Sequence, residues 1–204
     1  MACAAFLVTL GAGAAPATEA PVRILVLGDS LASGFGLEAG QSFPARLEVA
    51  LRQAGHDVRV LNAGVAGDTT AGGLARLDWS LADKPHAVIV ELGGNDGLRG
   101  VDPRSIRANL DAILTRLKSR DIPVLLTGMI APPNLGREYG EAFNAVFPQL
   151  ARRHGVAFYP FILDGVAGRA DLNQDDGIHP NRPGVTIMVD RIVPHVVRLL
   201  QTLE

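Results

Sequence analysis

The sequence predicts an α/β protein built on a parallel sheet, and three observations support this. Short apolar runs alternate with longer stretches that carry apolar residues at three- and four-residue steps. The run at 87–92 has the character of a strand buried on both faces. No internal repeat, low-complexity tract or interdomain linker interrupts the alternation after residue 21. Strands that alternate with helices of this length form parallel sheets with right-handed crossovers.

Five runs have the length and composition of strands, beginning with a β-branched apolar run directly after Pro21. They cover residues 23–27, 58–61, 87–92, 123–129 and 156–159. In a parallel sheet, ligands bind beyond the carboxyl ends of the strands. The segments that follow the first three strands should therefore meet at one edge of the sheet.

The stretches between these runs predict helices. We expect them at 42–54, 70–80, 102–117 and 139–154, with a last helix from residue 183 onward. Ser42 and Pro44 mark the first start, and Gly55 marks its end. Proline inside a helix removes a backbone hydrogen bond, so we expect Pro148 to kink its helix and Pro194 to break or bend the last one.

Composition limits the classes of function. The 204 residues are 48% hydrophobic and can bury one sizeable core. The net charge of -2 gives no sign of a nucleic-acid partner or a polybasic membrane patch. Cys3 is the single cysteine, which excludes an internal disulfide and a cysteine zinc site.

Residues 1–20 differ from the rest, so we expect a leader there and one folded domain over 21–204. A short apolar run followed by Ala12-Gly13-Ala14 is typical of a secretory signal and its cleavage site. The run is too short to span a bilayer. No Lys or Arg precedes Arg23, so the usual basic start is missing. We expect a periplasmic or secreted protein without an integral membrane span.

Ser30, Asp176 and His179 supply the residue types of covalent acyl transfer: nucleophile, orienter and base. Ser30 follows the first strand, where the alternative role is a helix N-cap. His179 lies in a glycine- and proline-rich loop, three residues after Asp176. A carboxylate at that spacing can hold the imidazole in one tautomer. Asp175 is the neighbouring alternative, although Asp176 is preferred.

Donors for an oxyanion follow the second and third strands. The Gly67 N–H is a candidate because glycine lets backbone approach a ligand closely. The Asn95 side-chain amide and the Ser30 N–H are the others. The alternative is that the glycines near Gly67 and Asn95 only make turns.

One segment imitates a nucleotide site. Residues 34–39 match a Gly-x-Gly-x-x-Ala dinucleotide pattern. The glycines lie several residues past the strand, and the second strand ends at Asn62 where an acidic ribose ligand is expected. We therefore expect no nucleotide cofactor here.

Four ordered blocks resemble those of the SGNH hydrolases, also called GDSL esterases and lipases. They are Gly28-Asp29-Ser30-Leu31, residues 62–69, Gly93-Gly94-Asn95-Asp96 and residues 176–181. The likeness runs from about residue 22 to the C-terminus and is nearest to the small bacterial arylesterase, thioesterase and lysophospholipase group. It implies a three-layer α/β/α flavodoxin-like fold with five parallel strands, no metal, and often a periplasmic location. It also implies Ser30 as nucleophile, His179 as base and Asp176 as its partner, with Gly67 and Asn95 as oxyanion donors.

We therefore expect a serine hydrolase of aryl or short- to medium-chain carboxylic esters, and also of acyl thioesters and lysophospholipids. Its partner is a small-molecule substrate; no cofactor is expected, and the oligomeric state stays open. Apolar residues near the predicted edge are candidates for the substrate site: Leu31, Leu98, Met129, Ile130 and Ile178. A carbohydrate O-acetyl esterase is the rival enzyme, but Trp79 is the single tryptophan and its predicted helix lies away from this edge. A flavodoxin-like small-molecule binder is the non-enzyme rival.

Overall fold

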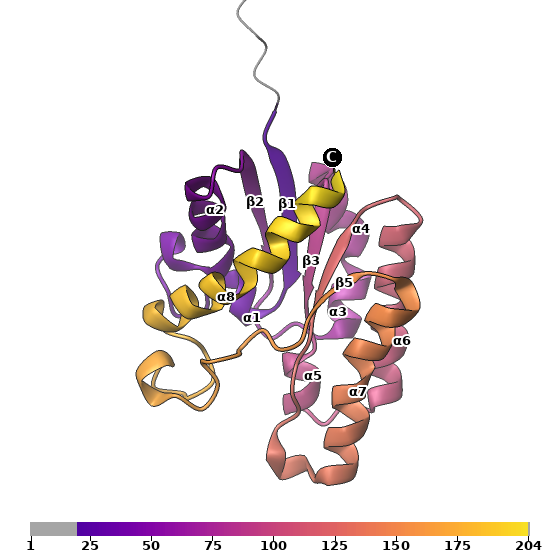
Figure 1. The fold of residues 1–204 in the computed structure, drawn as a ribbon. Helices are drawn as coiled ribbons and strands as arrows, with labels where there is room; N and C mark the ends of the chain where they lie inside the picture. Colours follow the sequence, from indigo (N-terminus) through magenta and orange to yellow (C-terminus); the bar gives the residue numbers. More distant parts are fainter. Residues whose placement is uncertain (1–19, 204) are drawn as a thin grey trace, which may run out of the picture.

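A five-stranded, all-parallel sheet forms the centre of the molecule in a computed structural model that describes residues 20–203 (Figure 1). The strands are β1 (Val22–Gly28), β2 (Val58–Gly64), β3 (Ala87–Glu91), β4 (Val124–Thr127) and β5 (Ala157–Tyr159), in the spatial order β2-β1-β3-β4-β5. Their apolar composition matches their position, since every residue of the central β3 is buried. The predicted α/β fold with five parallel strands is confirmed.

Helices cover both faces of the sheet and make three layers (Figure 1). One layer pairs α2 (Phe43–Gln53) with α8 (Arg182–Leu200). The other contains α3 (Thr70–Ala75), α6 (Pro103–Lys118) and α7 (Arg137–His154), with α6 packed between its two neighbours. Shorter helices are α1 (Ser30–Ser33), α4 (Leu77–Ser80) and α5 (Gly94–Leu98).

The register of the sheet aligns three strand ends. Gly28 at the end of β1 pairs with Gly64 of β2 on one side and with Glu91 of β3 on the other. The loops that follow these strands therefore leave the sheet side by side, at the lower end in Figure 1. This edge is where the sequence predicts the functional residues.

Several helices differ from the predicted ones. The expected helix 70–80 divides into α3 and α4 at Arg76. The short helix α5 was not expected, because its glycines favour turns. Of the two effects expected of Pro194, a break does not occur, since α8 continues to Leu200. Ile192 and Val196 are fully buried on either side of the proline, and their packing holds the helix together.

The predicted leader lies outside the described residues, apart from Ala20, so its export role stays a prediction. Within residues 20–203, none of the helices combines the length and the apolar character that crossing a membrane requires.

Candidate active site

Ser30 opens helix α1 directly after the end of β1. Asp29 occupies the N-cap position, and its carboxylate accepts a hydrogen bond from the Leu31 N–H at 3.0 Å. The alternative role of Ser30 as the N-cap is therefore wrong, because its neighbour is the cap. Gly34 ends the helix after one turn, with a left-handed φ of 81°.

The loop that carries His179 is folded tightly by its own backbone. Gln174 N–H donates to the His179 carbonyl at 2.8 Å. Gly177 has a positive φ of 69°, which glycine adopts without strain. Within this loop the Asp176 carboxylate accepts from the backbone N–H groups of Ile178 at 2.9 Å and His179 at 3.0 Å. The carboxylate is therefore fixed beside the imidazole.

The structure brings Ser30, His179 and Asp176 into one hydrogen-bonded chain. His179 Nδ1 lies 2.6 Å from Asp176 Oδ2, and His179 Nε2 lies 2.9 Å from Ser30 Oγ. The His179 hydrogen bond, joined by the two backbone N–H groups, lowers the pKa of Asp176 to about 2. An ionised Asp176 accepts the Nδ1 proton, which leaves Nε2 as the acceptor facing the Ser30 hydroxyl.

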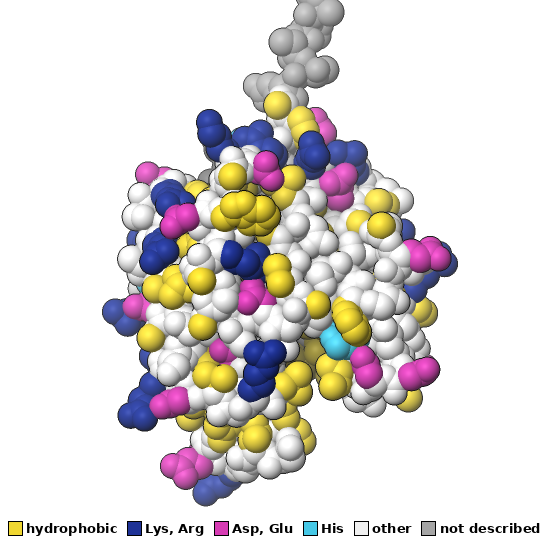
Figure 2. Space-filling model, turned by 180° about the vertical axis from the view of Figure 1, so that it is seen from behind, with side chains coloured by type: hydrophobic (Ala, Val, Ile, Leu, Met, Phe, Trp, Pro, Cys, Tyr) yellow, Lys and Arg dark blue, Asp and Glu magenta, His cyan; other side chains and the backbone are white. Residues whose placement is uncertain are grey.

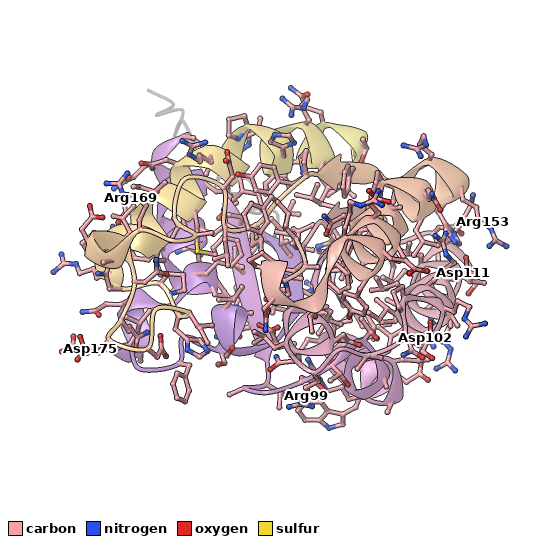
Figure 3. The ribbon with its side chains drawn as sticks, turned by 90° about the horizontal axis from the view of Figure 1, so that it is seen from below. Arg99, Asp102, Asp111, Arg153, Arg169 and Asp175 are labelled. Atoms are coloured by element: carbon pink, nitrogen blue, oxygen red, sulfur yellow. The ribbon has the colours of Figure 1, made fainter. Side chains whose placement is uncertain are left out.

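Asp175 is exposed and lies at the outer edge of the molecule, pointing away from the sheet when the strand ends are viewed from below (Figure 3). A different neighbour contacts the imidazole: the Phe35 ring lies 4.7 Å from it between centroids. The choice of Asp176 over Asp175 as the partner of His179 agrees with this arrangement.

Gly67 and Asn95 lie in the loops that follow β2 and β3. Gly67 has a φ of 79°, and Arg99 Nη2 donates to its carbonyl at 2.9 Å. Within residues 20–203, the Gly67 N–H has no hydrogen-bond acceptor. Asn95 belongs to α5, and its Nδ2 donates to Asp29 Oδ2 at 3.1 Å. These groups belong to the same edge of the sheet as Ser30.

An apolar pocket of about 460 Å³ opens beside Ser30. Asn95 and His179 also contribute to its wall, whereas Gly67 and Asp176 do not. All five predicted substrate-site residues line it: Leu31, Leu98, Met129, Ile130 and Ile178. In the view from behind, hydrophobic side chains gather beside one surface histidine (Figure 2).

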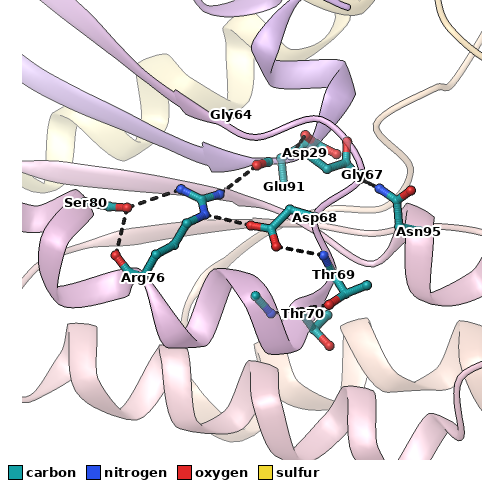
Figure 4. A network of polar contacts seen from close by, with 12 residues as sticks. Asp29, Gly64, Gly67, Asp68, Thr69, Thr70, Arg76, Ser80, Glu91 and Asn95 are labelled. Atoms are coloured by element: carbon teal, nitrogen blue, oxygen red, sulfur yellow. Dashed lines mark hydrogen bonds and ion pairs between the residues drawn. The ribbon is translucent and has the colours of Figure 1, made fainter.

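Sequence reasoning missed a polar network behind Ser30 (Figure 4). Arg76 Nε contacts Asp68 Oδ2 at 2.7 Å, and Arg76 Nη2 donates to the Gly28 carbonyl at 2.8 Å. Asp29 N–H donates to Glu91 Oε2 at 3.3 Å, and Glu91 is fully buried. One signal was present in the sequence: Glu91 is the one charged residue in the otherwise apolar run at 87–92.

Comparison with known proteins gives the family. Residues 26–187 match the GDSL-like lipase/acylhydrolase family. The chain belongs to this family. Esterase TesA of Pseudomonas aeruginosa is 42% identical over 178 residues, which cover 87% of this chain and 89% of the relative. Thioesterase 1/protease 1/lysophospholipase L1 of Escherichia coli (strain K12) is 41% identical over 168 residues, or 82% of this chain and 79% of the relative.

Solved structures of the GDSL-like family agree. The crystal structure of TesA superposes with a TM-score of 0.83 at 42% identity and covers 87% of this chain and 99% of its own. AlinE4, an SGNH-hydrolase family esterase, gives a TM-score of 0.76 at 48% identity, covering 90% of this chain and 99% of its own. The prediction of a carboxylic ester hydrolase of the GDSL type is confirmed.

Proposed function

We propose that this GDSL-like hydrolase cleaves carboxylic esters through a Ser30-His179-Asp176 triad and a covalent acyl-enzyme. The observation that carries the proposal is the 2.9 Å contact between Ser30 Oγ and His179 Nε2. A serine hydroxyl is a weak nucleophile until a base within hydrogen-bond reach takes its proton. That contact also counts against the flavodoxin-like binder, in which Ser30 has no need of a base.

In the first half-reaction, Ser30 Oγ attacks the acyl carbon while His179 Nε2 takes the hydroxyl proton. Asp176 stabilises the imidazolium that forms and keeps its orientation. The negative charge on the carbonyl oxygen is stabilised by the Gly67 N–H, the Asn95 amide and the Ser30 N–H. The tetrahedral intermediate then collapses, and His179 gives its proton to the departing alcohol or thiol.

In the second half-reaction, water replaces the alcohol. His179 takes a proton from the water as its oxygen attacks the acyl carbon of the Ser30 ester. The same donors stabilise the second oxyanion. Collapse breaks the bond to Ser30 Oγ, which regains its proton from His179, and the carboxylic acid leaves.

The preferred substrates in this proposal are aryl or short- to medium-chain acyl esters, with acyl thioesters and lysophospholipids as further candidates. The apolar walls of the pocket support an acyl or aryl group. Phe161 is the one aromatic ring besides the His179 imidazole among the described residues that line it, which gives a sugar little surface for stacking. The names of the relatives, esterase TesA and the thioesterase/lysophospholipase, agree with this range.

Replacing the nucleophile tests the proposal. Ser30→Ala should abolish hydrolysis of p-nitrophenyl esters, because no hydroxyl remains to form the acyl-enzyme. Ser33→Ala is the matched control: Ser33 lies in the same helix, and among residues 20–203 its hydroxyl bonds only the Ser30 carbonyl, at 3.3 Å. The control should keep wild-type turnover. Full activity of the Ser30→Ala enzyme would rule out Ser30 as the nucleophile.

A further inference from the structure

Asp29 is a buried carboxylate that the proposed reaction does not use. It lies between the end of β1 and the start of α1, and its exposed fraction is 2%. Its two oxygens have separate partners. Oδ1 accepts from the Leu31 N–H at 3.0 Å. Oδ2 accepts from Asn95 Nδ2 at 3.1 Å (Figure 4). The first contact caps a one-turn helix. The second joins the nucleophile loop to the loop of a proposed oxyanion donor.

The contact between Asp29 and Asn95 fixes the direction of the Asn95 amide. An ionised carboxylate only accepts hydrogen bonds, so the amide nitrogen, and not the amide oxygen, must face it. One N–H of Asn95 is thereby occupied, and rotation about the last side-chain bond is restrained. The second N–H is left for another acceptor, and Asn95 lines the pocket beside Ser30.

The surroundings hold Asp29 itself in place. Its backbone N–H donates to Glu91 Oε2 at 3.3 Å. A Cβ atom added at Gly94 would lie 3.2 Å from Asp29 Oδ2, so the α5 backbone also passes close to the carboxylate. A side chain packed this tightly can restrain its partner, which a solvent-exposed carboxylate cannot do.

We propose that Asp29 is a positioning residue for ester hydrolysis, whose carboxylate aims the second Asn95 N–H at the oxyanion of the tetrahedral intermediate. The inference rests on the proposed function of Asn95 as an oxyanion donor. It differs from the simpler role of Asp29 as the cap of α1, which needs only Oδ1. The two roles give different results when Asn95 is absent.

A double-mutant cycle separates these roles. Asp29→Asn removes one acceptor and places an amide against the Asn95 amide. On a p-nitrophenyl ester, kcat should therefore fall roughly 10- to 100-fold, with KM little changed. This is a smaller loss than removing an oxyanion donor altogether causes. In an Asn95→Ala background the same change should cost less than about threefold, because the amide to be aimed is gone. Equal losses in both backgrounds would overturn the inference.

A second substitution keeps the test valid if Asp29→Asn folds poorly. In Asp29→Ser, the hydroxyl can still cap α1, but it is too short to hold Asn95. This variant should lose kcat to a similar extent, and wild-type turnover would overturn the inference. Asp102→Asn, the same change at the N-cap of α6, is the control and should leave kcat unchanged.

The same cycle also tests, separately, the proposal that Asn95 is an oxyanion donor. If Asn95→Ala alone keeps full kcat, Asn95 is not an oxyanion donor, and the positioning role of Asp29 falls with it. If Asn95→Ala lowers kcat while the Asp29 and Asn95 losses simply multiply, only the positioning inference fails. Thermal denaturation of each variant checks that the compared proteins are folded.

Discussion

Asp29 and Glu91 are two buried acidic side chains next to Ser30 and the end of β1. Burial raises the pKa of Asp29 to about 6, while its bonds to Leu31 and Asn95 oppose the shift. Burial raises the pKa of Glu91 well above its ordinary value, and the nearby charge of Asp29 adds to this increase. Among the described residues, Glu91 Oε1 has no hydrogen-bond partner. A neutral Glu91 is the form that this environment favours.

This environment predicts a pH-dependent stability that Glu91 controls. Above the ordinary glutamate pKa of about 4.3, the unfolded chain loses a proton that folded Glu91 keeps, so stability falls as pH rises toward the folded pKa. Glu91→Gln removes this dependence and keeps an oxygen for the Asp29 N–H. Relative to wild type, the variant should gain stability as pH rises above about 4.3, by at most about 1.4 kcal/mol per pH unit.

Urea denaturation at several pH values measures the Glu91 effect. A constant stability difference between wild type and Glu91→Gln across this range would show that Glu91 does not retain its proton on folding.

At the scale of elements, Arg76 joins three parts of the chain that meet behind the site. It lies at the break between α3 and α4, and it contacts the Gly28 carbonyl, Asp68 and Ser80. The side chains of Arg76 and Asp68 are only 17% and 11% exposed. Because Gly28 precedes the loop of Ser30 and Asp68 follows Gly67, this one side chain fixes the spacing between the two loops that carry Ser30 and Gly67.

Arg76→Ala should therefore be costly to both stability and turnover. Removing one partner of a mostly buried pair leaves Asp68 uncompensated, which costs roughly 3 kcal/mol. Arg104→Ala is the control, because Arg104 pairs with Asp102 at a side-chain exposure of 92%. The control should leave the free energy of unfolding close to that of wild type, because water screens an exposed ion pair. Denaturant unfolding and kcat of both variants check this, and similar losses in the two would contradict it.

The sequence predicted more of the whole site than of the elements that support it. Ser30 and Asn95 could be expected at one edge because they follow neighbouring parallel strands. His179 could be expected there from its loop and its spacing to Asp176. The bond between Asp29 and Asn95 could not be predicted, because it depends on where the short helix α5 lies after the third strand. The break at Arg76 was missed for a similar reason, since long-range bonds to Gly28 and Asp68 override a continuous helical pattern.

The whole molecule also determines which esters fit, because the pocket is built from loops that follow several strands. Ala131 lies in its wall with an exposed fraction of 8%, in the segment after β4. Ala131→Leu should fill part of the space for the acyl chain. Each methylene that can no longer be buried costs about 0.8 kcal/mol, or about fourfold in kcat/KM. The loss should therefore grow with chain length, from little for the acetate ester to about tenfold or more for the octanoate.

A series of p-nitrophenyl esters from acetate to decanoate measures the Ala131 effect with one leaving group throughout. Ala142→Leu, the same change at an exposed position of α7, is the control and should keep the wild-type profile. An equal loss on every ester would place the acyl chain away from Ala131 and assign that wall of the pocket to the alcohol. A selective loss on long chains would identify the apolar space between Met129 and Ala131 as the acyl site, since only the acyl part varies along the series.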